Sequence, residues 1–262
     1  MVNQSVLGPW LRRPVVRPEA RLRLVCFPHA GGAASSFRPW QRLLPDEIEH
    51  VTVQYPGRED RFADGPVDSM DVLVREVVDA LQPLLDRPCA LFGHSMGSAV
   101  AYEVALELRR RGLRAPVRLL AAGRASPHHA VVGDIHHQDD SALIDELARY
   151  GGTPQEVLAD PELRAAILGY VRGDYRLIET YRPSSAEPLD CPVSVFFGSR
   201  DSECGARDAE TWSSTTRHPL TVTAFDGGHF FLVPRRALLV EAIGRDLGLD
   251  FRRPAHTWPS TP

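Results

Sequence analysis

The stretch LFGHSMGSAVA, residues 91–101, places one serine, Ser95, between two glycines. An apolar run, CALF, leads into it, and the run that follows, GSAVAYEVALELRRR, has helical composition. A strand, a sharp turn and a helix in this order form the setting in which G-x-S-x-G exposes a nucleophilic serine. Because the motif is short enough to occur by chance, the prediction depends on this setting and not on the motif alone. It predicts a buried strand that ends at Ser95, with a helix directly after it.

Five further runs rich in Val, Leu and Phe have the same strand-like character, and most of them end in Gly or Pro. They are RLRLVCFP, HVTVQYP, VRLLAAGR, PVSVFFGS and LTVTAFDGG. Such runs are typical of buried parallel strands. Helical spacing appears between several of them, at 69–85 and 97–111. The alternation predicts an α/β fold with a mostly parallel central sheet, right-handed crossovers and flanking helices.

The segment 130–187 breaks this alternation, because it contains no strand-like run. Helical spacing recurs there over three stretches: 141–150, 156–169 and 171–181. We expect a helical lid that caps the carboxyl ends of the strands, inserted into a single domain over residues 1–250. Residues 251–262 have a composition suited to a disordered tail.

Composition excludes several classes of chemistry. All 30 basic residues are arginine, so a P-loop, a lysine Schiff base and a Ser-Lys dyad are ruled out. The net charge of −4 leaves no electrostatic footprint for nucleic acid. The arginine run 109–111 fits the last turn of a helix, where cations suit the helix dipole.

The four cysteines form no C-x-x-C pair, which favours buried thiols in a reducing compartment. The first residues lack a signal-peptide core, and no stretch approaches 18 uncharged apolar residues. We therefore expect a cytoplasmic protein that does not span a membrane. We also expect it to be a monomer.

A serine hydroxyl needs a base to accept its proton as it attacks. The chain order Ser, Asp, His restricts the base to the histidines after Ser95, which are His128, His129, His136, His137, His218, His229 and His256. His229 follows the strand-like run LTVTAF and the turn DGG, at the carboxyl end of a strand. His218 precedes that strand, and His256 lies in the tail. We therefore predict that His229 is the base.

The base needs a carboxylate that orients its ring and stabilises the imidazolium. Asp201 follows PVSVFFGSR directly, again at a strand's carboxyl end, and His229 lies one strand further on. We predict that Asp201 fills this role; its alternative is a helix N-cap. Glu203 and Asp208, nearby, are expected to begin the following helix.

Attack on an acyl carbonyl develops an oxyanion that preorganised N–H groups must stabilise. One predicted donor is the backbone N–H of Met96, directly after the serine. The other belongs to the glycine loop PHAGG, which follows an early strand and precedes a helix start. We favour the N–H of Ala30, with Gly31 as the alternative; the glycine pair could also serve only as a tight turn.

The remaining histidines are given other roles. His94 adjoins Ser95, but neighbouring side chains diverge, so we expect it not to reach the serine. The doublets His128-His129 and His136-His137 are interpreted as solvated loop residues at the entrance to the cap, since no acidic or cysteine spacing there matches a zinc site. We expect no metal.

Taken together, six motifs resemble the type II thioesterases of polyketide and nonribosomal peptide assembly lines, members of the α/β-hydrolase superfamily. They are FPHAGG, YPGRE, GHSMG, AGRASPH, GSRD and GGHFFL, in this order. The resemblance covers about residues 20–245. One departure is Ala122, where a serine is common before Gly-Arg, and it leaves the predicted triad untouched.

The resemblance implies hydrolysis of stalled or misprimed acyl groups from the phosphopantetheine arm of an acyl carrier protein or peptidyl carrier protein, without a cofactor. The family's nucleophile, acid and base fall on Ser95, Asp201 and His229. Another serine esterase or a chain-releasing thioesterase is the first alternative, and a catalytically idle protein that only binds carrier proteins is the second. The sequence does not name the acyl chain or the pathway.

Overall fold

The computed structural model describes residues 7–129, 133–153 and 155–249. Within these ranges, seven strands form one sheet in the order β1-β3-β2-β4-β5-β6-β7, with β1 antiparallel to β3 and all other neighbours parallel. The strands are β1 (Leu11–Arg12), β2 (Leu22–Phe27), β3 (Ile48–Val53), β4 (Cys89–His94), β5 (Arg118–Ala122), β6 (Val193–Gly198) and β7 (Thr221–Phe225). The predicted parallel sheet flanked by helices is confirmed.

Each of the six predicted strand-like runs forms a strand, and every residue of β2, β3, β4 and β6 is buried. The structure adds β1, which the sequence did not predict, because a two-residue edge strand is too short to show alternation. In β2, Val25 and Phe27 pack on one side of the sheet, and Leu24 and Cys26 on the other. The sheet therefore separates two hydrophobic cores.

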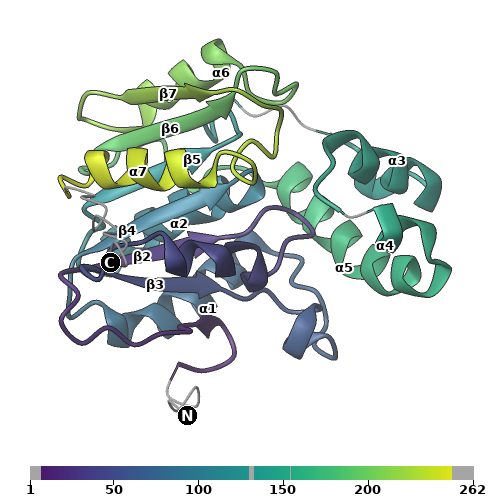
Figure 1. Cartoon of the computed structure of the whole chain (residues 1–262), viewed down its shortest axis with the longest axis horizontal. Helices are drawn as coiled ribbons and strands as arrows, with labels where there is room; N and C mark the ends of the chain where they lie inside the picture. Colours follow the sequence, from purple (N-terminus) through teal and green to yellow (C-terminus); the bar gives the residue numbers. More distant parts are fainter. Residues whose placement is uncertain (1–6, 130–132, 154, 250–262) are drawn as a thin grey trace, which may run out of the picture.

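Helices cover both faces of the sheet (Figure 1). On one face lie α1 (Met70–Leu81) and α2 (Met96–Arg110), and on the other lies α7 (Arg236–Asp246). The short helix α6 (Ala206–Glu210) follows β6. The helix start predicted after the PHAGG loop is a 3-10 helix over Ala34–Arg42 that contains Pro39, a residue without an N–H to donate.

Between β5 and β6 stand the helices α3 (Asp140–Tyr150), α4 (Gln155–Ala159) and α5 (Pro161–Thr180). The helix boundaries predicted at 156–169 and 171–181 are wrong, because the break falls at Asp160. The Asp160 carboxylate caps the N–H groups of Glu162 and Leu163, at 2.9 and 3.0 Å, and Pro161 suits the first turn of a helix. The interior glycine at 169 does not interrupt α5.

These three helices, called here the helical segment, lie together at one side of the molecule (Figure 1), and the end of α5 packs beside α2. They share a small core of their own, formed by Leu143, Leu147, Leu158, Leu168 and Val171. Its role as a lid, within the domain predicted over 1–250, stays a prediction. The start of the predicted insertion, 130–132, and the predicted tail lie outside the described residues. Within those residues, no helix combines the length and apolarity needed to cross a membrane.

Candidate active site

Ser95 occupies a strained turn between β4 and α2. Its φ of 52° and ψ of −117° lie where a side chain is costly, by about 1–3 kcal/mol. The turn is held because the Ser95 N–H donates to the carbonyl of Ala122 at 2.8 Å, and the Ser95 carbonyl accepts the N–H of Ser98 at 2.9 Å. The central strand of the sheet thus ends in the predicted strand–turn–helix, with Ser95 at its tip.

The two motif glycines permit this close packing. A Cβ on Gly97 would lie 2.1 Å from the carbonyl oxygen of Phe27, at the end of β2. A Cβ on Gly93 would lie 2.2 Å from the carbonyl oxygen of Gly97. Since neither approach is possible for real atoms, the glycines let α2 begin directly against the sheet.

Asp201 and His229 meet at the ends of two neighbouring strands. The His229 Nδ1 lies 3.1 and 3.0 Å from the two carboxylate oxygens of Asp201. The His229 side chain is 7% exposed and that of Asp201 is fully buried. Because a carboxylate accepts, Nδ1 carries the proton and Nε2 is left with a lone pair. Asp201 also accepts the N–H of Glu203 at 2.9 Å in a turn, but it does not cap α6, whose N-cap is Gly205.

His94 contacts the backbone of His229. Its Nε2 lies 3.0 Å from the carbonyl oxygen of His229 and must donate, since a carbonyl only accepts. Burial, with the nearby His229 and His29 rings, holds the pKa of His94 well below its usual value, so the ring is neutral. The His94 Nε2 binds His229 rather than Ser95, and sequence reasoning gave no signal for this contact because the two histidines are 135 residues apart.

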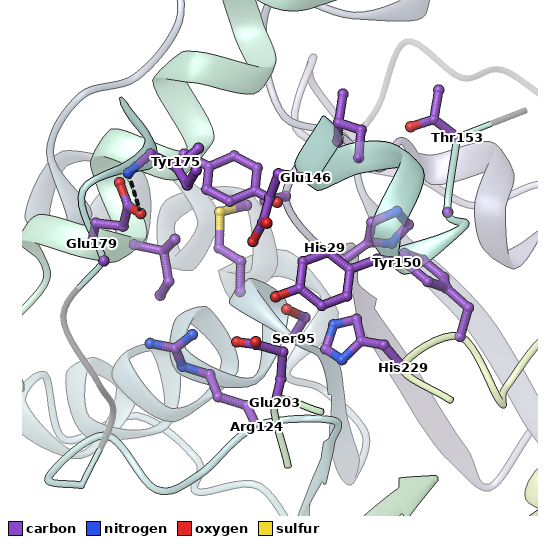
Figure 2. A pocket seen from close by; sticks show the side chains of 18 of the residues that line it. His29, Ser95, Arg124, Glu146, Tyr150, Thr153, Tyr175, Glu179, Glu203 and His229 are labelled. Carbon is purple, nitrogen blue, oxygen red and sulfur yellow. Dashed lines mark hydrogen bonds between the residues drawn. The ribbon is translucent and has the colours of Figure 1, made fainter. Parts of the chain in front are cut away.

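Ser95 and His229 face one pocket of about 290 Å³ (Figure 2). The core of the fold supplies these two residues together with Ala30 and Met96, and the helical segment supplies the opposite wall, including Tyr150. Asp201 touches His229 from outside the pocket wall. A serine, an oriented imidazole and backbone N–H groups around one cavity can perform acyl transfer.

The two predicted oxyanion donors both line this pocket. Met96 is the first residue of α2, so its N–H has no partner within the helix. Ala30 lies in the loop after β2. The alternative donor, the Gly31 N–H, is already committed to the carboxylate of Asp174 on α5, at 2.8 Å. Ala30 therefore remains the candidate.

The structure corrects two of the expectations for this region. Glu203 does not begin α6 but lines the pocket, where Figure 2 shows it near Ser95. His136 is not solvated: its Nδ1 lies 2.5 Å from Glu179 of α5. Both contacts join segments far apart in the chain, which local patterns do not register. Within the described residues, no cluster of three or more His, Cys, Asp or Glu could hold a metal ion.

Tyr150 is a pocket residue that the sequence did not single out. Its ring centroid lies 5.0 Å from that of His229. Burial and the neighbouring Glu203 carboxylate raise the pKa of Tyr150, so its hydroxyl stays protonated. The wall opposite the serine thus presents an aromatic face and a hydroxyl rather than a purely apolar surface.

A sheet of this order that carries a serine turn at the end of its fourth strand has the α/β-hydrolase fold, and the class of enzyme that such a site defines is the serine hydrolase. Residues 22–247 match the model of the thioesterase domain family. The chain belongs to that family and acts on thioesters.

Relatives of known name agree with this assignment. The gramicidin S biosynthesis protein GrsT of Aneurinibacillus migulanus is 35% identical over 94% of this chain and 96% of its own. Among solved structures, the type II thioesterase BorB from the borrelidin biosynthetic cluster has a TM-score of 0.85 at 35% identity, covering 94% of this chain and all of its own. The thioesterase RedJ of the prodiginine pathway in Streptomyces coelicolor has a TM-score of 0.83 at 38% identity, covering 89% and 96%.

Proposed function

We propose that this enzyme is a type II thioesterase that removes stalled or misprimed acyl groups from the phosphopantetheine arm of carrier proteins in polyketide or nonribosomal peptide biosynthesis. The observation that carries the chemistry is the meeting of Ser95 with the His229–Asp201 pair at one pocket. The choice of substrate draws on relatives named for such pathways. The partner is an acyl carrier protein or a peptidyl carrier protein.

The first half-reaction transfers the acyl group to the serine. His229 Nε2 takes the proton of the Ser95 hydroxyl as the oxygen attacks the thioester carbonyl. The N–H groups of Ala30 and Met96 stabilise the oxyanion. When the C–S bond breaks, the proton on His229 passes to the leaving pantetheine sulfur, and an acyl-Ser95 ester remains.

The second half-reaction hydrolyses this ester. His229 takes a proton from water, the hydroxide oxygen bonds to the acyl carbon, and the same two N–H groups stabilise the second oxyanion. The proton then returns to the Ser95 oxygen as the ester bond breaks and the acid leaves. Asp201 keeps the imidazole oriented and stabilises its charged form in both steps. No step needs a cofactor or a metal.

The helical segment acts as the lid in this proposal. Leu147 and Tyr150 of α3 and Ile178 of α5 line the pocket opposite Ser95. The acyl chain would lie between these side chains and the strand ends, so the segment controls which chains fit and shields the ester from bulk water.

The test uses carrier proteins loaded with a series of acyl chains. The full-length enzyme is mixed with each, and mass spectrometry follows the released acid and the mass added to the peptide that contains Ser95. We expect release from at least one carrier and a transient acyl adduct. The Ser95→Ala variant gives neither. Release from no carrier would contradict the proposal.

A second measurement separates the thioesterase from a general esterase. The ratio of kcat/KM for an acyl carrier protein to that for a simple ester of the same acid is determined. We expect a ratio well above one, because the carrier adds binding contacts that the ester lacks. A strong preference for the ester would favour the esterase alternative.

A further inference from the structure

A buried ion pair outside the predicted triad joins the helical segment to the loop that carries Ala30. The Arg58 guanidinium donates to both carboxylate oxygens of Asp174, at 2.6 and 2.7 Å. Their side chains are 3% and 7% exposed. Arg58 comes from the YPGRE motif after β3, and Asp174 from the middle of α5. Neither residue lines the pocket, and the reaction described above does not use them.

Both partners also bind the backbone of the glycine loop. Arg58 Nη1 donates to the carbonyl of Gly32 at 2.9 Å, and Asp174 Oδ2 accepts the N–H of Gly31 at 2.8 Å. The loop then closes on itself, since the Gly32 N–H donates to the carbonyl of His29 at 2.9 Å. The ion pair therefore holds two successive residues of this loop.

This chain of hydrogen bonds ends at the peptide unit between His29 and Ala30, which carries the proposed oxyanion donor. The carbonyl of His29 and the N–H of Ala30 belong to the same trans peptide unit, so they point in opposite directions. A carbonyl held by Gly32 on one side leaves the Ala30 N–H directed to the other. Ala30 lines the pocket that contains Ser95, which is where an oxyanion donor has to be.

The pair is firmly placed by its surroundings. The guanidinium carbon of Arg58 lies 4.6 Å from the ring centroid of Tyr170 and 5.3 Å from that of Tyr55, within the range of cation–π contact. Burial by itself lowers the pKa of Arg58, but the charge and hydrogen bonds of Asp174 more than offset this, and the pKa ends above its usual value. Gly31, at φ 78°, packs against Val171 of α5.

We propose that Arg58 and Asp174 are positioning residues that hold the Ala30 N–H in the oxyanion hole, so that seating of α5 and assembly of the oxyanion hole are coupled. This inference rests on the proposed acyl-transfer function. Without the pair, the loop keeps its glycines but loses the two contacts that set its orientation. Transition-state stabilisation is then lost, whereas the pocket and the Ser95–His229–Asp201 groups remain.

Asp174→Asn is the direct variant, because it keeps the shape of the side chain and removes its charge. It also leaves the buried Arg58 cation without a counter-ion, which is strongly destabilising. The double variant Arg58→Met with Asp174→Leu avoids this, since apolar replacement of a buried ion pair is often neutral for stability. Both are made in the full-length chain.

Two pantetheine compounds report on the oxyanion hole separately from the pocket. A trifluoromethyl ketone forms a tetrahedral adduct with the serine and places an oxyanion in the hole, whereas a thioether analogue fills the pocket without one. In the double variant we expect ketone affinity to fall at least tenfold and thioether affinity to stay within twofold. For the carrier substrate, kcat falls at least tenfold with KM within twofold.

The matched control is Glu103→Gln. Glu103 on α2 is also a buried carboxylate at the helical segment's base, accepting from the Tyr181 hydroxyl at 2.5 Å and the Ser184 N–H at 3.0 Å, but it does not touch the glycine loop. We expect a lower Tm and an unchanged ratio of ketone to thioether affinity. A control that loses ketone affinity as the double variant does would show a general structural effect.

The outcomes separate the two proposals. Equal losses for ketone and thioether in the double variant, or no loss for either, would overturn the positioning role. If the wild type binds the ketone but releases no acid from any carrier, the proposed function fails, and the ketone arm still decides the role of Arg58 and Asp174.

Discussion

The sheet and the helical segment differ in how much apolar packing and how many polar contacts hold them in place. The central strands are buried throughout and lie between two large hydrophobic cores. The helical segment has a core of its own of only five buried side chains. Leu177 and Ile178 of α5 also pack into the large core beside α1 and α2, and polar contacts add to this attachment. The polar contacts centre on two buried carboxylates: Asp174 of α5, which binds Arg58, and Glu103 of α2, which accepts from Tyr181 directly after α5. Apolar burial is strong and non-directional, whereas a hydrogen-bonded ion pair adds less stability but sets geometry.

Because of this difference, the two sides of the site are expected to have different roles in the reaction. Ser95, Asp201 and His229 stand on loops at strand ends, where the well-packed sheet keeps their mutual geometry. The far wall of the pocket, including Tyr150, belongs to the segment with the smaller core. Changes on the sheet side should therefore act on the chemical step, and changes in the pocket wall that the helices supply should act on substrate fit. Asp174 is the exception, because it reaches the glycine loop that carries Ala30.

The largest expected effect is on the sheet side. Ser95→Ala should lower kcat by about 10⁴-fold or more, because no acyl-enzyme can form, with Tm unchanged. Tyr150→Phe, which keeps the ring beside His229, should change kcat less than threefold. Steady-state kinetics with an acyl carrier protein measure both, and the exposed Ser36→Ala serves as the control. A loss from Tyr150→Phe as large as that from Ser95→Ala would break the division between the two regions.

Asp201→Asn should follow, with a loss of about 10³- to 10⁴-fold in kcat, since an amide can stabilise the wrong tautomer of His229 and cannot balance its charge. Asp208→Asn is the matched control. Asp208 also follows β6, but it accepts the N–H of Gly205 at 2.9 Å as a cap of α6. That variant keeps an oxygen that can accept this N–H and loses only the charge near the helix N-terminus, so it should cost at most about 1 kcal/mol of stability and leave kcat within twofold. Comparable kinetic losses in the two variants would remove Asp201 from the proposed triad.

A third pair of variants compares a core that packs against the sheet with the core of the helical segment. Phe92→Ala in β4 should lower the free energy of global unfolding by about 3–5 kcal/mol. Leu143→Ala in α3 removes an equally buried side chain, but we expect local opening of the helical segment before the sheet unfolds. Hydrogen exchange tests this: amides of α3 exchange faster in Leu143→Ala while those of β4 do not. Equal acceleration in both elements would show that the molecule opens as one unit.

The smallest expected effect is on folding stability at low pH. Burial, and then the charge of Arg17, lowers the pKa of His50 in β3 to about 4. Between that value and the ordinary 6.5, the unfolded chain binds a proton that the folded chain does not, so stability falls as the pH falls. His50 should account for about 2 kcal/mol of the loss between pH 7 and pH 5.

Urea unfolding at the two pH values checks this expectation. The His50→Gln variant should lose about 2 kcal/mol less than the wild type over the same interval. The exposed His137→Gln variant, beside the helical segment, should lose as much stability as the wild type between pH 7 and pH 5. If both variants behave like the wild type, the acid sensitivity does not come from His50.

Local sequence patterns predicted most of the sheet because buried strands show as continuous apolar runs. They were less successful in the helical segment, where Asp160 and Pro161 start a new helix that the apolar spacing alone did not reveal. The short edge strand at Leu11–Arg12 was missed for lack of length.

The sequence by itself determined the strand–turn–helix at Ser95 and placed Asp201 and His229 after two successive strands. Parallel strands bring their carboxyl ends to one edge, so position along the chain is enough to predict that these residues gather. Tertiary structure alone decided which side chains support them. Arg58 and Asp174 are 116 residues apart, and His94 and His229 are 135 apart. No local period encodes such contacts, because they arise only when the helical segment and the loops pack against the finished sheet.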